Sequence, residues 1–352
     1  KALVALIPEN AIPREAEIGL DWPVLGFSLG LAMCTALLFG LAPAMQTARR
    51  DIVEPLKDSG RGISGGFRRG RLRNALVVME LALSLVLLTG AGVMIRTFVK
   101  LQTTDLGFNP KNILVARLPF PKDQYRTAVE KQRFFGRLLP RLTALPGVVA
   151  ATETSGLPPY GGIRTDIDIT GKTHLDRWRA MYQLVSESYL RTVGAKVVRG
   201  RMFEEGEVVG ARKIAVVNQT LVARWFGHED PMGRQLVIKD LGAGGGAGGG
   251  ARRDSTPASA AFEIVGVMSD MKNSGIQDPA EPEILVPYTV TGTFERGILV
   301  RTASNPVGLL NAVRREIWAV DRNVSMTETR SLEDFLSDFS YAQPRFMLLV
   351  LG

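Results

Sequence analysis

The sequence predicts a membrane protein that combines transmembrane α-helices with a large extracytoplasmic domain of α+β structure. Three observations lead to this fold class. Two apolar segments of bilayer length lie near the start of the chain, a basic segment links them, and short strands and amphipathic helices interleave over the rest. The chain has 352 residues, a net charge of +8 and 45% apolar residues, so it is long enough for about two domains.

The first apolar segment covers residues 22–45 and carries no charged residue. Trp22 suits the membrane–water interface, and a proline at position 23 suits the first turn of a helix. Gly26 and Gly30 stand in the GxxxG spacing that allows a second helix to approach closely, although this spacing is common in membrane segments. We predict a transmembrane helix at 22–45, preceded by the end of an extracytoplasmic loop at 1–21.

The second apolar segment is predicted as a transmembrane helix and stalk at 74–104. Residues 75–95 would form a helix about 31 Å long, close to the thickness of the bilayer's hydrocarbon core. Their eleven Leu, Ile and Val residues contribute about −3 to −6 kcal/mol to insertion. The single acid, Glu80, opposes this by at most about 3.5 kcal/mol and lies away from the centre. The alternative is a core helix of a soluble domain, but the second membrane-length segment favours a membrane protein.

Glu80 has two possible roles, a functional intramembrane acid or a polar residue bonded to an adjacent helix. We favour the polar contact because nothing else in the span ionises.

The link at 46–73 has eight basic and three acidic residues, a net charge of +5. Such a short basic loop is expected to stay in the cytoplasm, where it can also contact lipid headgroups. This interpretation places residues from about 105 to 343 outside the cell membrane, and we do not expect nucleic acid to be a partner. The basic topology determinants are Arg49, Arg50, Arg68, Arg69, Arg71 and Arg73.

The remaining residues, 105–343, are predicted to form one α+β domain. Gly107 and Pro110 should end the stalk. A strand at 112–120, an amphipathic helix at 125–145 kinked or ended near Pro140, and a strand after Pro146 form a strand–helix–strand unit that is compatible with parallel pairing. Further strands are expected in RAMYQLVSE, RKIAVVN, RQLVIK, FEIVGVMSD, EILVP and GILVRT, and further helices in TLVARWFG, NPVGLLNAVRREIWAV and RSLEDFLSDF.

The sequence contains no recognisable catalytic, cofactor or metal site. Gly244, Gly246 and Gly249 have GxGxxG spacing, but no helix start and no Gly-Lys-Ser/Thr follow them, so we interpret 241–260 as a flexible Gly-rich loop between two strands. The chain has one cysteine, Cys34, and two histidines, His174 and His228, too few for a His/Cys zinc cluster. His228 is expected in a surface turn.

Several ordered motifs resemble the MacB/FtsX-type ABC transporter permeases. APAMQTARRDIVEPLK resembles the end of an FtsX-type permease unit, and RLRNALVVMELALSLVLLTGAGVMIRTFVKL resembles the first helix of a MacB-type permease. The outside part follows the family's order through LPGV, SESYLRTVGAKVVRGRMF, AVVNQTLVARWFGHEDPMGRQL, FEIVGVMSD, EILVP, VRTASNP and AVDRNVSMTETRSLED, and QPRFMLLV would open the next membrane helix at 344–352. The tail of one unit before the head of another is similar to the middle of a duplicated permease, so we expect the chain to be part of a longer polypeptide.

The resemblance implies a function without enzymatic activity in this chain. A partner ATPase would bind ATP and Mg and hydrolyse ATP in the cytoplasm, and the membrane helices would carry the movement to a MacB-type extracytoplasmic domain for export. The expected location is the bacterial inner membrane, with several spans, and the expected partners are lipid, the ATPase, and a periplasmic adaptor or another extracytoplasmic protein. The transported substrate is unknown. Two alternatives are a membrane-anchored sensor or regulator without transport, and an extracytoplasmic hydrolase, for which no nucleophile–base set is present.

Overall fold

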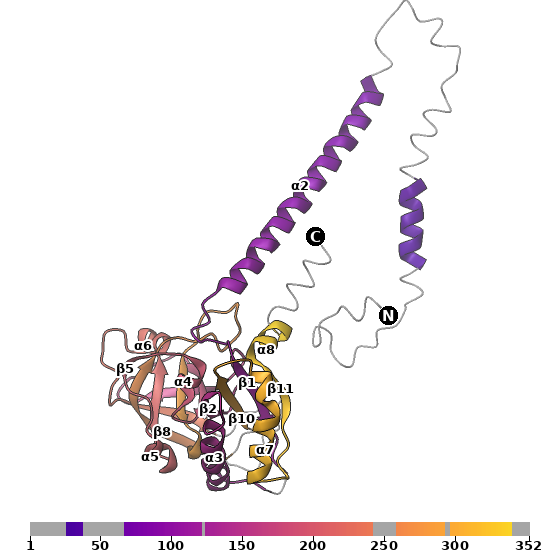
Figure 1. The fold of residues 1–352 in the computed structure, drawn as a ribbon. Helices are drawn as coiled ribbons and strands as arrows, with labels where there is room; N and C mark the ends of the chain where they lie inside the picture. Colours follow the sequence, from indigo (N-terminus) through magenta and orange to yellow (C-terminus); the bar gives the residue numbers. More distant parts are fainter. Residues whose placement is uncertain (1–25, 38–66, 122–123, 242–257, 293–295, 340–352) are drawn as a thin grey trace, which may run out of the picture. The chain divides into compact units, whose positions relative to one another are not determined.

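The computed structural model describes residues 26–37, 67–121, 124–241, 258–292 and 296–339 (Figure 1). It divides into two compact units, one formed by Lys1–Arg96 with Phe346–Gly352 and one formed by Thr97–Arg345. The predictions for 1–21, 344–352 and most of the Gly-rich loop, together with Arg49 and Arg50, lie outside the described residues.

Helix α2, Phe67–Thr103, provides most of the described part of the first unit. It begins seven residues before the predicted segment 74–104, within the predicted linker, and contains one segment of 25 residues, Val77–Leu101, that is long and apolar enough to cross a membrane. A shorter apolar helix covers Gly26–Leu37. The rest of the predicted 22–45 span is outside the described residues, so a second span stays a prediction.

The middle of α2 is apolar on every side. Four consecutive residues, Leu85, Val86, Leu87 and Leu88, are each more than 60% exposed. Because successive residues of an α-helix point about 100° apart, these four side chains surround the helix. An amphipathic helix of a soluble protein would instead have one polar face. This exposed apolar surface is typical of a helix in contact with lipid.

The second unit is an α+β domain, in agreement with the predicted mixed content. After α2 its strands and helices are β1 (Ile113–Leu118), α3 (Ala128–Thr143), β2 (Val148–Thr154), β3 (Ile163–Ile169), β4 (Arg179–Val185), α4 (Tyr189–Val193), β5 (Val197–Gly200), α5 (Glu205–Val209), β6 (Ile214–Asn218), α6 (Gln219–Trp225), β7 (Gln235–Leu241), β8 (Ala258–Met268), β9 (Glu283–Pro287), η3 (Tyr288–Val290), β10 (Arg296–Thr302), η4 (Pro306–Leu309), α7 (Leu310–Val320), β11 (Thr327–Ser331) and α8 (Leu332–Phe339).

Four antiparallel strands in the order β11-β1-β10-β2 form the first part of the sheet. Strands β1 and β2 run in the same direction but do not pair, because β10 lies between them and hydrogen-bonds to both. The parallel pairing of these two strands considered from the sequence is therefore wrong. Strand β2 also meets β4 at one position, Thr154 opposite Val185, and this joins the first part of the sheet to the second.

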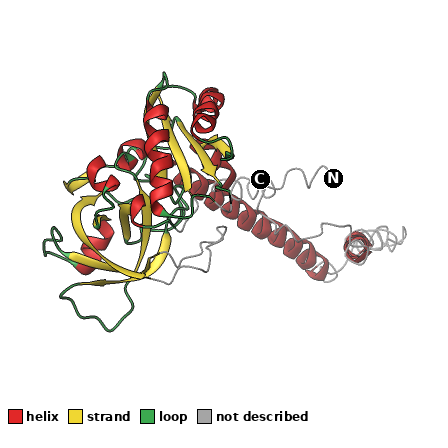
Figure 2. Cartoon of the chain, turned by 90° about the horizontal axis from the view of Figure 1, so that it is seen from below, coloured by secondary structure: helices red, strands yellow, loops and turns green. Residues whose placement is uncertain are grey.

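The second part of the sheet closes on itself as a barrel (Figure 2). Its strands follow the order β4-β3-β7-β8-β6-β9, and β9 pairs back onto β4. The pairs β4–β9 and β6–β8 are parallel, and the other pairs around the ring are antiparallel. The ring removes most of the open strand edges, which would otherwise present unpaired backbone groups. Fully buried apolar side chains from these strands include Ile167, Tyr182, Val216, Leu236, Ile238, Phe262 and Ile284.

Helix α3, Ala128–Thr143, lies within the amphipathic segment predicted at 125–145, and its first turn is capped. The Thr127 hydroxyl accepts from the Glu130 backbone N–H at 3.2 Å, and the Glu130 carboxylate accepts from the Thr127 N–H at 3.0 Å, a capping box. The buried face carries Phe134, Phe135, Leu138 and Leu142, and the helix packs against β2 and α7. It continues for three residues past Pro140, so the proline does not end it.

A carboxyl group lies buried at the start of β9. Glu283 is fully buried, and its Oε1 accepts hydrogen bonds from Gln183 Nε2 at 2.6 Å and Asn273 Nδ2 at 2.7 Å. Burial raises the pKa of Glu283 to about 7, and the two amide donors partly oppose this shift. The folded protein therefore holds a proton on Glu283 at pH values where the unfolded chain has released it.

This proton makes stability depend on pH. Between the ordinary pKa of about 4.5 and the raised value of about 7, unfolding releases a proton, so stability should fall as the pH rises through that window. We expect E283Q to remove up to about 3 kcal/mol of this dependence. The measurement is the melting temperature of the purified protein at pH 5, 6, 7 and 8, with the exposed E263Q as the control. An unchanged pH profile in E283Q would contradict the assignment.

Candidate functional site

The end of α2 is inserted into the core of the α+β domain. Leu101, in the last turn of the helix, is buried, and so are Leu106 and Phe108 in the segment that follows. The Thr104 hydroxyl donates to the Lys100 carbonyl at 2.7 Å and satisfies one of the free carbonyls at the helix end. We call residues 101–112 the junction, because they lead from the apolar helix into strand β1.

At Gly107 the backbone of the junction lies directly against the backbone of the loop after β8. The φ of +73° at Gly107 is a left-handed conformation that favours glycine, and the Asp105 side chain accepts from the Gly107 N–H at 2.9 Å. A Cβ at this position would lie 1.9 Å from the carbonyl oxygen of Asp270, in the loop after β8. The neighbouring Leu106 carbonyl accepts from the Lys272 N–H at 3.0 Å. The junction backbone therefore packs directly on the backbone of this loop.

Arg301, on β10, holds the junction from the other side. Its guanidinium donates to three backbone carbonyls, Asn109 at 2.7 Å and Lys111 at 3.1 Å in the junction and Thr192 at 2.6 Å in α4. The Asn109 N–H in turn donates to the Val193 carbonyl at 2.8 Å. Partial burial lowers the pKa of Arg301. One side chain thus joins the junction to α4 and to the sheet.

The loop that receives Gly107 is also tied to α6. The Asp270 carboxylate accepts from both the backbone N–H of Thr220, at 2.8 Å, and its hydroxyl, at 2.9 Å. Thr220 lies in the first turn of α6, where a carboxylate is also favoured by the helix dipole. A displacement of the junction would therefore be felt both at β10 and at α6.

We expect Gly107→Ala to disrupt the junction, because the methyl group cannot be placed without moving backbone on one side. The matched control is Gly171→Ala, since Gly171 also has a positive φ, +85°, but has no neighbour within 4 Å of a Cβ. Both variants carry the conformational cost of about 1 kcal/mol, and only G107A adds the clash. The measurement is amide exchange at Lys272 and Asn109, which should become faster in G107A alone. Equal behaviour of the two variants would show that the close approach has no effect.

Some of the site residues predicted from the sequence lie among the described residues, but the structure does not show the helix or lipid contacts predicted for them. Gly26 and Gly30 lie on the short helix, and no described atom is within 4 Å of a Cβ at either position. Glu80 is exposed on α2. Arg68, Arg69, Arg71 and Arg73 belong to the first turns of the same helix. The proposed packing face, polar contact and topology signal all stay predictions.

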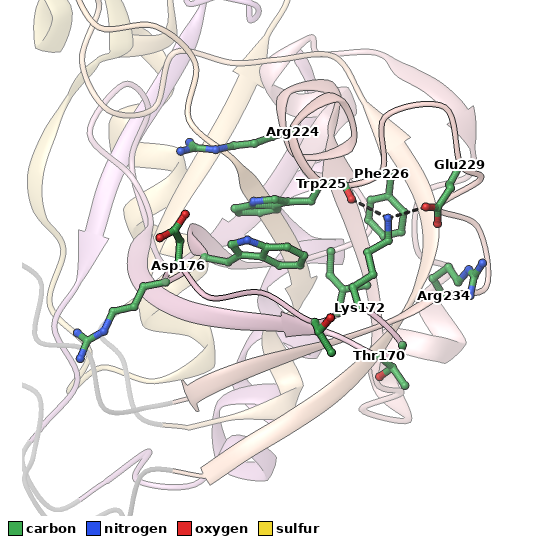
Figure 3. Close-up of a pocket in the computed structure, with 13 residues that line it drawn as sticks. Thr170, Lys172, Asp176, Arg224, Trp225, Phe226, Glu229 and Arg234 are labelled. Atoms are coloured by element: carbon green, nitrogen blue, oxygen red, sulfur yellow. Dashed lines mark hydrogen bonds and ion pairs between the residues drawn. The ribbon is translucent and has the colours of Figure 1, made fainter.

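A pocket of about 630 Å³ lies beside the C-terminal end of α6 (Figure 3). Trp178, Trp225 and Arg224 line the pocket and belong to a column of stacked side chains that His174 completes outside it. The ring centroids of Trp178 and Trp225 lie 5.4 Å apart, His174 stacks on Trp178 at 4.2 Å, and the guanidinium of Arg224 lies 5.8 Å from the Trp225 ring. His174 Nε2 also lies 3.0 Å from Asp168 Oδ1. Both faces of each indole are therefore covered.

Sequence reasoning did not find this pocket or the junction contacts. It gave His174 no role, and the structure places it in the column. His228 is exposed in the turn after α6, as predicted. Among the described residues, no three His, Cys, Asp or Glu side chains lie close enough to hold a metal ion. The sequence did contain a signal that Arg301 has a structural role, because this charged residue stands within the apolar run GILVRT.

A family model identifies the family of this chain. The family model described as the MacB-like periplasmic core domain matches residues 24–317. No curated protein matches the chain. Among solved structures, the periplasmic region of MacB from Actinobacillus actinomycetemcomitans is similar, with 13% identity, a TM-score of 0.42, and coverage of 67% of this chain and 95% of that one.

Two further structures are similar at lower scores. The extracellular domain of the noncanonic ABC-type transporter YknZ from Gram-positive bacteria has 14% identity, a TM-score of 0.37, and coverage of 63% of this chain and 97% of that one. A domain of a putative permease protein from Porphyromonas gingivalis has 14% identity, a TM-score of 0.37, and coverage of 64% and 92%. Since the family model matches most of the chain, this protein belongs to the family with a MacB-like periplasmic core domain, the ABC transporter permeases that its motifs resemble.

Proposed function

We propose that the chain is the permease subunit of an ABC transporter and that α2 transmits movement between the membrane and the α+β domain. In this proposal the domain lies outside the inner membrane and Val77–Leu101 crosses the bilayer. A partner ATPase binds ATP and Mg and hydrolyses ATP in the cytoplasm, so this chain contributes movement and no chemistry. A duplicated permease with further spans, including 22–45, would contain it.

The observation that carries the proposal is the locked end of α2. The helix is continuous from Phe67 to Thr103, and its last turn is buried in the domain core. Arg301 and the Gly107 contact fix the following residues to β10 and to the loop after β8. Because interfaces of this kind are bistable and do not deform gradually, a shift of the helix would be passed to the domain as a whole.

A helix break in the stalk tests this role. Val99→Pro removes one backbone hydrogen bond of α2 and should cost about 3 kcal/mol of local helix stability, while Val99→Ala keeps the helix. Val99 is exposed, so neither change removes a core contact. The protein and its ATPase are reconstituted in nanodiscs, and amide exchange of the junction is compared with and without ATP and vanadate.

We expect the nucleotide to change junction exchange in the parent protein and in V99A, and this response to be lost in V99P while ATP turnover continues. A parent protein whose junction does not respond to nucleotide would overturn the proposal. Inside-out vesicles then separate export from sensing. ATP-dependent uptake of a macrolide, peptide or lipopeptide probe supports a transporter. If nucleotide changes the amide exchange of the junction but no probe is taken up, the result supports the sensor.

A further inference from the structure

We infer that the pocket beside α6 is a docking site for an acidic segment of an extracytoplasmic protein partner. This inference names the partner's chemistry and rests on the proposed function for the location of the domain. It is carried by the charge, rigidity and shape of the pocket.

The pocket wall has unbalanced positive charge. Lys172 is neutralised, because its Nζ lies 3.0 Å from Glu229 Oε1 and also donates to the Trp225 carbonyl at 2.8 Å (Figure 3). Arg177, Arg224 and Arg234 also line the pocket, and none of them has an ion pair with any residue that the structure describes. Asp176 is the remaining acid of the wall. The surface therefore favours a negatively charged ligand.

The arrangement of these cations favours an extended ligand over a single small anion. Arg224 and Arg234 lie on opposite sides of the pocket, with Trp225 and Phe226 between them (Figure 3). A peptide with spaced Asp or Glu side chains can pair with each guanidinium group in turn, one on each side of the pocket.

The aromatic column favours a protein over a carbohydrate. A sugar stacks on a free aromatic face, but the faces of Trp178 and Trp225 are covered by each other, by His174 and by Arg224. The column instead provides a stiff, preorganised edge. Trp and Arg are among the residues that contribute most at protein–protein interfaces, and side chains that are already stacked, as Arg224 and Trp225 are, lose less conformational entropy on binding.

An exposed apolar residue completes the surface. Leu175 lies at the tip of the loop between β3 and β4 and is fully exposed, at 106%. A second pocket of about 540 Å³, lined by Thr173, His174, Leu175, Asp176 and Trp178, adjoins the column on this side. A partner segment that combines acids with an apolar side chain would fill both pockets.

The site is also connected to the junction. Arg224 and Trp225 are at the C-terminal end of α6, and Thr220 near its other end is held by Asp270, whose carbonyl faces Gly107. A bound partner would thus press on a short helix that is tied to the end of α2.

The test is photocrosslinking in intact cells. Leu175 is replaced by p-benzoylphenylalanine in the otherwise complete protein, and the crosslinked peptides are sequenced by mass spectrometry. We expect a segment rich in Asp and Glu from an extracytoplasmic protein. The yield should fall at least tenfold in R177E/R224E and stay within twofold in the control R133E/R315E, whose arginines are exposed on α3 and α7. Poly-L-glutamate added to spheroplasts should reduce the yield, and inorganic phosphate at the same charge concentration should not.

Each other result would overturn the inference. Crosslinks to lipid, to a second copy of this chain or to a neutral segment would identify a different occupant, and so would an equal loss in the two arginine variants. Absence of a crosslink would show that no partner docks there. Junction exchange in response to ATP and vanadate is measured on the same R177E/R224E protein. An unchanged response shows that the variant is folded and keeps failure of this inference separate from failure of the permease role.

Discussion

Replacing Val86 and Leu87 together by lysine should abolish insertion of α2 and leave the α+β domain inside the cell. Both side chains are more than 60% exposed near the middle of Val77–Leu101, so their loss removes no protein contact in the described structure. Two lysines at mid-bilayer cost about 5–7 kcal/mol, whereas the nine Leu, Ile and Val residues that remain in the span contribute only about −3 to −5 kcal/mol.

The lone cysteine makes this result measurable. Cys34 is changed to alanine and Val149, which is exposed on β2, to cysteine. A membrane-impermeant maleimide added to spheroplasts should label V149C in the parent protein and not in V86K/L87K. The matched control V209K/V307K adds the same two charges at exposed positions of the domain and should be labelled like the parent. Labelling of V86K/L87K would show that α2 is not the span.

Local features of the sequence predicted most of the individual elements. Helix α3 could be predicted because the Thr127–Glu130 capping box and the spacing of its apolar residues are both local signals. The 3-10 turn η4, which leads into α7, begins after Asn305, whose side chain accepts from the Val307 N–H, and α7 ends at its C-cap residue, Asp321.

Some strands were missed for physical reasons. Strand β3, IRTDIDI, has the alternating pattern of a strand with one buried face, and this signal could have been used. Strand β5 is exposed at every residue, and β11, TETRS, is a polar edge strand. Their formation depends on the strands they pair with, so neither carries a local signal.

The sheet order and the candidate sites depend on contacts between distant parts of the chain. Nothing near β1 or β2 shows that β10 will lie between them. Gly107 could be predicted as the end of the stalk, but its contact with Asp270 could not. The column likewise brings His174 and Trp178 from a loop to Trp225 at the end of a helix.

Above about pH 8, Arg296→Met should strongly destabilise the α+β domain, because the buried Glu153 carboxyl then lacks the counter-charge that lets it ionise. Arg296 and Glu153 are completely buried, with Arg296 Nη1 3.2 Å from Glu153 Oε1. Arg296 Nη2 also donates to the carbonyls of Tyr288, at 3.1 Å, and Thr291, at 2.8 Å. Burial raises the pKa of Glu153 to about 8, and Arg296 opposes the shift. Removing one partner of a buried pair costs about 3–5 kcal/mol.

The expected loss of melting temperature is about 6–20 °C, from roughly 2–4 °C per kcal/mol for a domain of this size. Differential scanning fluorimetry of the purified protein at pH 9 measures it, because the Glu153 carboxyl of the parent is ionised there. The double variant E153Q/R296M removes both charges and should recover at least half of the loss, since replacing a whole buried pair by neutral residues of similar volume is often tolerated. No recovery would mean that Arg296 acts through its bonds to the Tyr288 and Thr291 carbonyls.

The pH dependence separates charge from packing. In R296M the pKa of Glu153 rises further because its counter-charge is gone, so the folded state keeps a proton that the unfolded chain loses above its ordinary pKa of about 4.5. Stability of R296M should then fall more steeply than that of the parent as the pH rises above 8, where the parent carboxyl has ionised. At pH 5 Glu153 is neutral in both proteins, and the difference should be smallest. A deficit in melting temperature of equal size at pH 5 and pH 9 would assign the loss to packing and hydrogen bonds, and the ion pair would then have no part in holding β2 to β10.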